Sequence, residues 1–158
     1  MALIPDIART WRRPKAVMVE KISEGTEPLA LVYLMLACAL VFVAQWPRLS
    51  RQAYLESTDV QPLIGATLMA WLFIMPLALY LIAGLVHLVS RLVKRPVTPF
   101  AARMALFWGL MAAVPAWLLH GLTAGFVGPG PALTIVGFVA LAAFVWFVAA
   151  GLRAGRVA

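Results

Sequence analysis

The chain has 158 residues, of which 64% are hydrophobic and 12% are charged, and its mean hydropathy is +0.95. Soluble domains carry about 25% charged residues, so this composition excludes an ordinary soluble globular protein and indicates an integral membrane protein. The net charge is +7, but the basic residues flank apolar stretches, where anionic lipid headgroups attract them. Membrane lipid is therefore an expected partner and nucleic acid is not.

Residues 1–27 are predicted to form a cytoplasmic amphipathic segment. Ile4, Ile7 and Trp11 recur at a helical spacing on one face, and Pro14 is suited to begin a second short helix. Basic residues beside a tryptophan favour a helix lying at the level of the lipid headgroups. The alternative is a segment that packs back against the cytoplasmic end of the bundle. We single out three residues for docking to the membrane or to a partner: Trp11, Arg12 and Arg13.

Three long stretches carry no Asp, Glu, Lys or Arg: residues 28–47, 60–90 and 104–152. A membrane-spanning helix needs about 20 apolar residues, so each of the first two stretches holds one span and the third holds two. The predicted fold is therefore all-α, an integral membrane bundle of four transmembrane helices within residues 28–152. A cytoplasmic tail is expected at 153–158.

Prolines divide this region further. The predicted spans cover residues 28–46, 62–90, 100–120 and 131–152. Pro47 is expected to end the first span. Pro76 lies near the middle of the second span and should kink it, because proline removes a backbone hydrogen bond. Pro115 lies near the outer end of the third span.

Basic residues are unequally divided between the two sides of this bundle. Eleven Lys and Arg residues fall in the N-terminal segment, the second connection and the C-terminal tail, against two, Arg48 and Arg51, in the first connection. The positive-inside rule then places both termini in the cytoplasm, and the composition suits a multi-pass protein of the bacterial inner (cell) membrane. Three residues after the second span are predicted to bind anionic lipid: Arg91, Lys94 and Arg95.

The sequence "GFVGPGP" at 125–131 interrupts the last apolar stretch. A phosphate-binding loop would need Lys-Ser/Thr after the glycines and a strand before them, and neither occurs here. We expect a short reverse turn at the outer membrane surface, with a re-entrant loop as the alternative. The overlapping "GLTAG" at 121–125 has the GxxxG spacing, but in this interpretation it straddles a helix end, which makes it a weak packing signal.

The spans offer little chemistry. The six carboxylates all lie outside the predicted spans, although ion-coupled transporters generally carry ionisable groups inside the membrane. Only His87 and His120 are candidates for intramembrane polar contacts, and they fall at opposite ends of the bundle. Cys38 is expected to be a small packing residue. No catalytic residue, metal ligand or cofactor site is predicted, and the chain is not expected to be an enzyme.

The order of features resembles the Yip family of small multi-pass membrane proteins, especially its bacterial members. The stretches that carry the resemblance are "DIARTWRRPKAVMVEKI", "FVAQWPRLSRQAYL", "AWLFIMPLALYLIAGLVHLVSRLV", "ARMALFWGLMAAVPAWLL" and "GPGPALTIVGFVALAAFVWFVAAGLR". The resemblance implies a non-enzymatic helical membrane protein. Eukaryotic relatives engage Rab-type small GTPases through a cytoplasmic N-terminus, which in this chain is only about 27 residues long.

These observations predict a non-catalytic integral membrane protein that acts by interaction. It would serve as a scaffold or an accessory subunit of a bacterial membrane complex, with lipids and other membrane subunits, or copies of itself, as partners. The alternative is a small solute or ion transporter or channel. In that case kinks at Pro76 and Pro115 would open a path that contains His87 or His120.

Overall fold

The computed structural model describes residues 2–156, and nearly all of this range is helical. The elements, in chain order, are α1 (Leu3–Arg12), α2 (Pro14–Glu24), α3 (Glu27–Glu56), α4 (Val60–Met69), the π-helical turn η1 (Ala70–Ile74), α5 (Met75–Leu92), α6 (Pro99–Phe126) and α7 (Pro131–Ala154). α4, η1 and α5 follow one another without a break, and we call this continuous helix the rod (Val60–Leu92).

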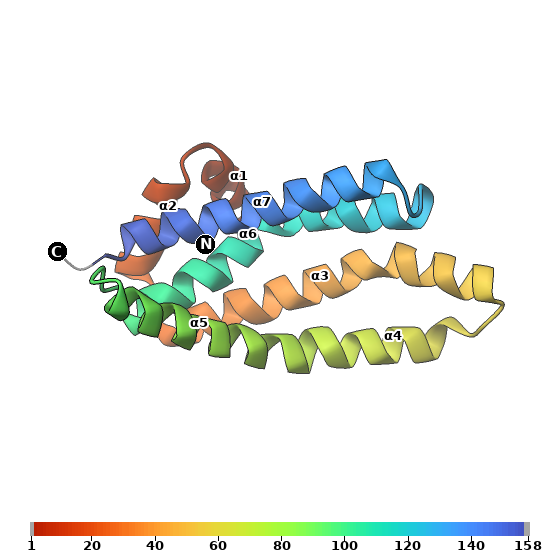
Figure 1. The fold of residues 1–158 in the computed structure, drawn as a ribbon, viewed down its shortest axis with the longest axis horizontal. Helices are drawn as coiled ribbons and strands as arrows, with labels where there is room; N and C mark the ends of the chain where they lie inside the picture. Colours follow the sequence, from red (N-terminus) through yellow and green to blue (C-terminus); the bar gives the residue numbers. More distant parts are fainter. Residues whose placement is uncertain (1, 157–158) are drawn as a thin grey trace.

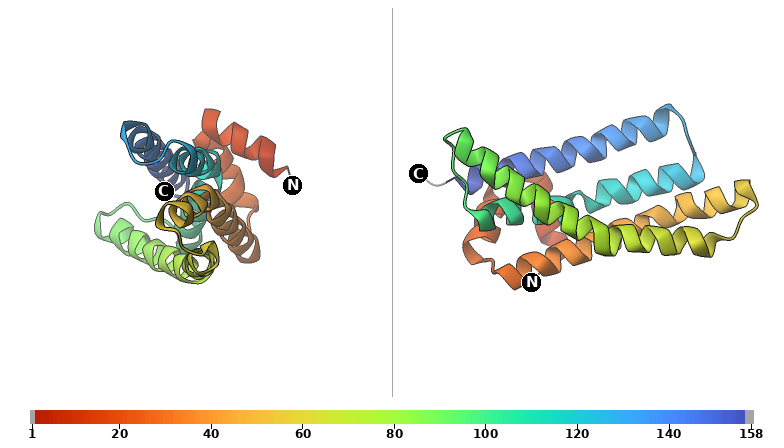
Figure 2. Two further views of the ribbon diagram at one scale, coloured as in Figure 1. Left: turned by 90° about the vertical axis from the view of Figure 1, so that its right-hand side faces the viewer. Right: turned by 60° about the horizontal axis from the view of Figure 1, so that its bottom comes forward.

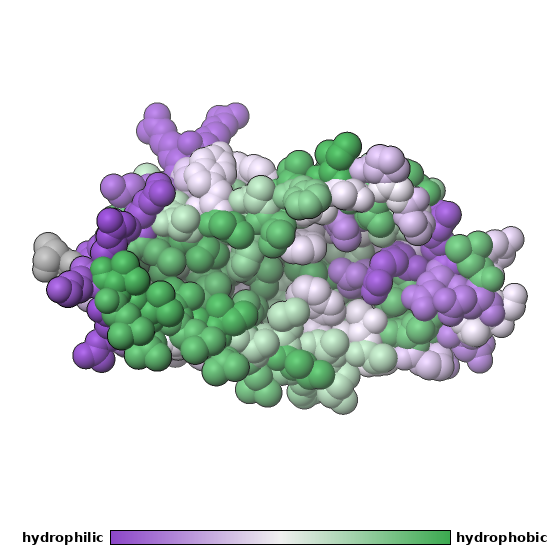
Figure 3. All heavy atoms as spheres, viewed as in Figure 1, coloured by the Kyte–Doolittle hydropathy of each residue, from purple (hydrophilic) through white to green (hydrophobic). Residues whose placement is uncertain are grey.

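Four of these helices are long and apolar enough to cross a membrane: α3, the rod, α6 and α7. The prediction of an all-helical protein with four candidate spans is therefore confirmed. Figure 3 shows hydrophilic residues gathered toward the two ends of the molecule, with mostly apolar side chains between them on the face that it draws. α1, α2, the connection between α5 and α6, and the end of α7 share one end (Figure 1).

Helix α6 is the axis of the bundle. It packs against α3 on one side and α7 on the other, as Figure 1 shows. Its most apolar stretch is 67% buried, against 44% for α3, 28% for α7 and 17% for the rod. The end-on view in Figure 2 shows α1 and α2 on one side of the bundle and the rod on another. The rod is thus the least covered of the four spans.

Glycines bring the backbone of α6 into contact with α3. A Cβ atom added to Gly121 would lie 1.8 Å from the carbonyl oxygen of Ala44, and one added to Gly125 would lie 2.3 Å from the ring of Pro47. The weak reading of "GLTAG" is therefore wrong. α6 continues to Phe126 rather than ending at residue 120, so both glycines lie within the helix and form its closest approach to α3.

The expectation that Pro47 ends the first span is also wrong, because α3 continues to Glu56. The proline ring packs against Gly125 of α6, and the following turns bury Leu49 and Ala53. Packing against a neighbouring helix compensates for the missing backbone hydrogen bond, as is common for prolines in transmembrane helices. The connection predicted for the outer side shrinks to residues 57–59.

The sequence predicts a kink at Pro76. The structure has the π-helical turn η1 directly before this proline. The Met75 N–H donates to the carbonyl of Ala70, five residues earlier. Because Pro76 has no N–H to offer the preceding turn, this wider turn reorganises the hydrogen bonds around it. The rod therefore passes the proline without losing its helical continuity.

The turn predicted at "GFVGPGP" is confirmed. α6 ends at Phe126, α7 begins at Pro131, and the N–H groups of Val127 and Gly128 both donate to the carbonyl of Thr123. Gly128 has a φ of +84°, and a Cβ atom there would lie 2.7 Å from the Arg51 guanidinium. Arg51 reaches from α3 and donates to the Gly125 carbonyl at 3.2 Å, so it covers the carbonyl end of α6.

We predict that Gly121→Ala destabilises the bundle, because the added methyl group meets the rigid backbone of Ala44. Overpacking of this kind costs about 1–3 kcal/mol. The matched control is Gly65→Ala on the rod, where a Cβ atom meets nothing within 4 Å and alanine should be neutral or stabilising by about 0.5–1 kcal/mol. Thermal unfolding in one detergent compares the two. Equal midpoints would show that the α3–α6 approach is not a stabilising contact.

Candidate functional site

The polar side chains of the two N-terminal helices meet the bundle in a cluster that we call the N-terminal clasp: Asp6, Thr10, Lys21, Tyr33 and Trp108. α1 and α2 supply the first three, while α3 supplies the tyrosine and α6 the tryptophan. Of the two arrangements considered for the N-terminal segment, the contacts support packing against the bundle.

An ion pair lies at the centre of the clasp. The Lys21 Nζ donates to the Asp6 Oδ2 at 2.6 Å, and the two side chains are only 11% and 13% exposed. A second, longer contact of 3.4 Å joins Nζ to the Tyr33 hydroxyl. The same ammonium lies 4.5 Å from the centroid of the Trp108 ring and 5.5 Å from that of Tyr33. The lysine is thus held by a carboxylate and two aromatic rings, with ion-pair and cation–π attraction combined.

Thr10 connects this ion pair to the axis of the bundle. Its side chain is completely buried and accepts a hydrogen bond of 3.1 Å from the Trp108 indole. Its own hydroxyl donates to the Asp6 carbonyl at 2.7 Å. Trp108 and Tyr33 also pack edge to face, with 4.8 Å between ring centroids. These polar groups all have partners, as buried polar groups must.

The pairing shifts the pKa values of both charged groups. Burial by itself would raise the pKa of Asp6, but the hydrogen bond and charge of Lys21, with help from Arg9, bring it below its ordinary value. Burial likewise opposes the charged form of Lys21, but its contacts with Asp6 and Tyr33 raise its pKa above the ordinary value. Each partner therefore stabilises the ionised state of the other.

A pocket of about 370 Å³ opens beside the clasp, between α1, α2 and the start of α3. Asp6, Lys21 and Tyr33 form part of its wall, together with Glu20 and Glu24. Glu20 is itself paired with Arg9 at 2.9 Å. The ion pair and the two aromatic rings together hold α1 and α2 against the bundle.

The structure separates the three residues predicted for docking. The Trp11 indole donates to the Ala112 carbonyl at 2.9 Å, and its ring packs edge to face on Phe147 at 5.1 Å. Arg12 and Arg13 are exposed, and within residues 2–156 neither takes part in an ion pair. Trp11 therefore anchors α1 to α6 and α7, while the two arginines remain available to headgroups or a partner.

His87 organises the connection between α5 and α6. Its Nδ1 donates to the Val97 carbonyl at 2.9 Å. Ser90 donates to the His87 carbonyl at 2.7 Å and accepts from the Val97 N–H at 3.3 Å. Arg91, Lys94 and Arg95 lie exposed at this end of the bundle. His87 thus binds backbone within its own chain.

His120 lies at the other end of the bundle. Its ring packs edge to face with Trp117, at 5.8 Å between centroids. A Cβ atom on Gly137 would come within 3.3 Å of the imidazole, so the glycine makes room for it. The two histidines are therefore at opposite ends, as predicted. Among residues 2–156, no three His, Cys, Asp or Glu side chains are close enough to hold a metal ion.

Sequence reasoning missed the clasp. Asp6 and Lys21 lie on separate short helices, and no spacing in the sequence pairs them. Tyr33 and Trp108 lie in charge-free stretches far apart in the chain. Because these four residues lie on four different helices, only the packing of the bundle brings them together.

Comparison of the chain with models of protein families, with curated proteins and with solved structures yields no match. Functional inference therefore rests on the residues themselves. The Yip resemblance stays a prediction.

We predict that Lys21→Met loosens α1 and α2 on the bundle, because the Asp6 carboxylate then keeps only Arg9, at 3.2 Å, and the ammonium leaves the Tyr33 and Trp108 rings. Loss of one hydrogen bond between charged groups costs about 1.5–3 kcal/mol. Hydrogen–deuterium exchange should show faster exchange across α1 and α2 while α6 is unchanged. Lys15→Met is the matched control, since Lys15 is exposed on the same helix. Equal protection in the two variants would contradict a stabilising clasp.

The clasp should also depend on pH. The contribution of Asp6, whose pKa is lowered, is complete above about pH 4 and is lost as the pH falls through the lowered pKa. That of Lys21, whose pKa is raised, is complete below about pH 10 and is lost as the pH rises through the raised pKa. The clasp is therefore expected to be closed between these limits.

Spin labels at the exposed Ile4 and Leu92, in a chain with Cys38 replaced by alanine, measure this closure as a distance. The distance distribution should broaden in acid, and Asp6→Asn should be broad at neutral pH and insensitive to acid. A distribution that stays narrow in Asp6→Asn would contradict this role for the carboxylate.

Proposed function

We propose that the chain is a non-catalytic integral membrane protein that acts through contacts with other membrane proteins. It would serve as a scaffold or accessory subunit of a complex in the bacterial inner membrane. The observation that carries this proposal is a pair of uncovered glycines on the rod. The Yip resemblance points to the same class of function.

Glycines in the spanning helices fall into two groups. At Gly109, Gly121, Gly125, Gly137 and Gly151 a Cβ atom would meet an atom of a neighbouring helix within 4 Å. At Gly65 and Gly84 it would meet nothing within that distance. Both uncovered glycines belong to the rod.

Small residues in membrane helices allow a neighbouring backbone to come close, and helix association in lipid depends on such packing. Because a π turn adds about one residue to the helix, Gly65 and Gly84 are about five turns apart and on roughly the same side of the rod. Exposed Leu77, Leu81 and Leu88 line the neighbouring positions around Gly84. This side has the composition of a helix-docking face.

The other elements suit this function. The N-terminal helices, the basic α5–α6 connection and the end of α7 lie together at one end of the bundle (Figure 1), which in our proposal faces the cytoplasm. Arg12 and Arg13 would then contact anionic headgroups or a cytoplasmic segment of a partner.

Transport has less support. His87 is engaged with the Val97 carbonyl and His120 packs beside Trp117 and Gly137, at opposite ends of the bundle. α6, which runs between these two ends, is the most buried of the four candidate spans, and apolar side chains such as Phe107 and Met111 are buried along it.

We predict that a photoreactive amino acid at Leu81 forms a discrete protein adduct in native membranes. The matched control is Ile135 on α7, because the two side chains are similarly exposed, 67% and 63%. Gly84→Leu should abolish the Leu81 adduct by blocking close approach. Mass spectrometry of the adduct distinguishes a second copy of this chain from another subunit. Identical products at Leu81 and Ile135 would contradict a docking face on the rod.

A further inference from the structure

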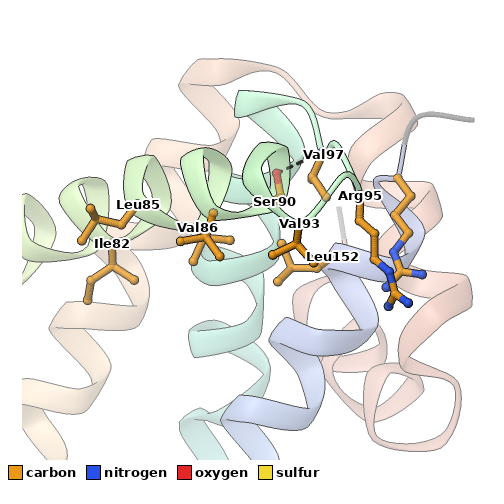
Figure 4. Close-up of a pocket in the computed structure, with 10 residues that line it drawn as sticks. Ile82, Leu85, Val86, Ser90, Val93, Arg95, Val97 and Leu152 are labelled. Atoms are coloured by element: carbon orange, nitrogen blue, oxygen red, sulfur yellow. Dashed lines mark hydrogen bonds between the residues drawn. The ribbon is translucent and has the colours of Figure 1, made fainter.

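A groove of about 400 Å³ runs along the inner side of α5, toward the connection that follows it (Figure 4). Its walls are apolar, with Ile82, Leu85, Val86 and Val89 from α5 and Leu152 from α7. Val93 and Val97 close the end next to the connection. A groove of this kind on a membrane protein accepts an extended hydrocarbon chain.

Hydrogen bonds hold the closed end of the groove in place. Ser90 is the polar uncharged residue in its lining, and its hydroxyl is engaged with the His87 carbonyl and the Val97 N–H. Figure 4 shows the second of these contacts. Val97 also forms an isolated antiparallel bridge with Arg156. The connection and the C-terminal residues therefore lie side by side at this end of the groove.

Two arginines lie at this closed end. Arg95 comes from the connection and Arg156 from the residues after α7, and both line the groove and are exposed. Within residues 2–156, none of the ion pairs involves either guanidinium. Two guanidinium groups without an ion pair in the described part of the chain, at the end of an apolar channel, are complementary to an anion joined to a hydrocarbon chain.

We propose that this groove is a binding site for one anionic phospholipid. An acyl chain lies between α5 and α7, and the phosphate is held by Arg95 and Arg156. The two arginines lie at the end of the apolar groove, so the site would bind both the phosphate and an acyl chain of one lipid molecule. General attraction of basic residues to the membrane surface needs no such groove. Of the three residues that the sequence predicted to bind anionic lipid, only Arg95 lines the groove, and Arg156 takes the place of Arg91 and Lys94.

This site is independent of the proposed docking face. The lipid would occupy the side of α5 that faces α7, whereas Gly84 is in open space and does not line the groove. Each inference can therefore fail without the other.

The test is native mass spectrometry of the full chain released from micelles that contain phosphatidylglycerol or phosphatidylcholine with the same acyl chains. We expect one retained phosphatidylglycerol and little phosphatidylcholine. The double variant Arg95→Gln/Arg156→Gln should retain about tenfold less phosphatidylglycerol. The matched control Arg91→Gln/Lys94→Gln removes the same charge outside the groove and should change retention less than about twofold.

The channel is tested separately. Val89→Trp fills the groove, whereas Leu88→Trp places the same indole side chain at a position that does not line it, and the two native residues are equally exposed at 53%. Only the first should reduce retention. Inorganic phosphate should not displace the lipid.

Four results would overturn the site, and three of them are comparisons. These are equal loss in the two double variants, equal retention of the two lipids by the unmodified chain, and equal effects of the two tryptophan variants. Displacement by inorganic phosphate would also overturn it, since the acyl chain would then contribute nothing.

Discussion

The architecture depends on how closely the backbone of α6 approaches its neighbours. In a membrane, apolar side chains gain little by leaving lipid, so helices associate through close packing. α6 meets this requirement with Gly121 and Gly125 against α3, and with Gly109 and Ala105 against Val148 and Gly151 of α7. Because both sides of α6 are used, α3 and α7 occupy fixed positions around it. The rod and the N-terminal helices then pack on the surfaces of α3, α6 and α7 that these contacts leave free.

The N-terminal helices use a different kind of contact. Trp108 and Ala112 of α6 exchange hydrogen bonds with Thr10 and Trp11 of α1, and the Lys21–Asp6 pair closes over the tryptophan ring. A segment rich in charge is thereby coupled to the axis of an apolar bundle. Moving α1 away from α2 would separate this ion pair, and moving it away from α6 would break the hydrogen bonds of Thr10 and Trp11.

The sequence predicted the features that depend on neighbouring residues. Charge-free stretches gave the four candidate spans, and the local pattern of glycine and proline gave the turn between α6 and α7. The errors at Pro47 and "GLTAG" have one cause. Pro47 continues a helix because Gly125 receives its ring, and Gly125 belongs to the last turn of α6, beyond the end predicted at residue 120, where it makes that contact. The contact between Pro47 and Gly125 cannot be predicted from either residue alone, because the two are far apart in the sequence. The clasp could not be predicted for the same reason.

The rod differs from the other spanning helices in two ways. No other helix among residues 2–156 packs against its glycines, and the groove beside it is not filled by side chains. Few buried contacts hold it, and a π turn divides it next to Pro76, so its two halves can adjust with little cost to α3, α6 and α7. A helix on the side of Gly84 and a lipid on the side facing α7 would supply the contacts that the chain itself does not. Because Gly84 does not line the groove, a partner helix and a lipid could occupy the two sides of α5 at the same time.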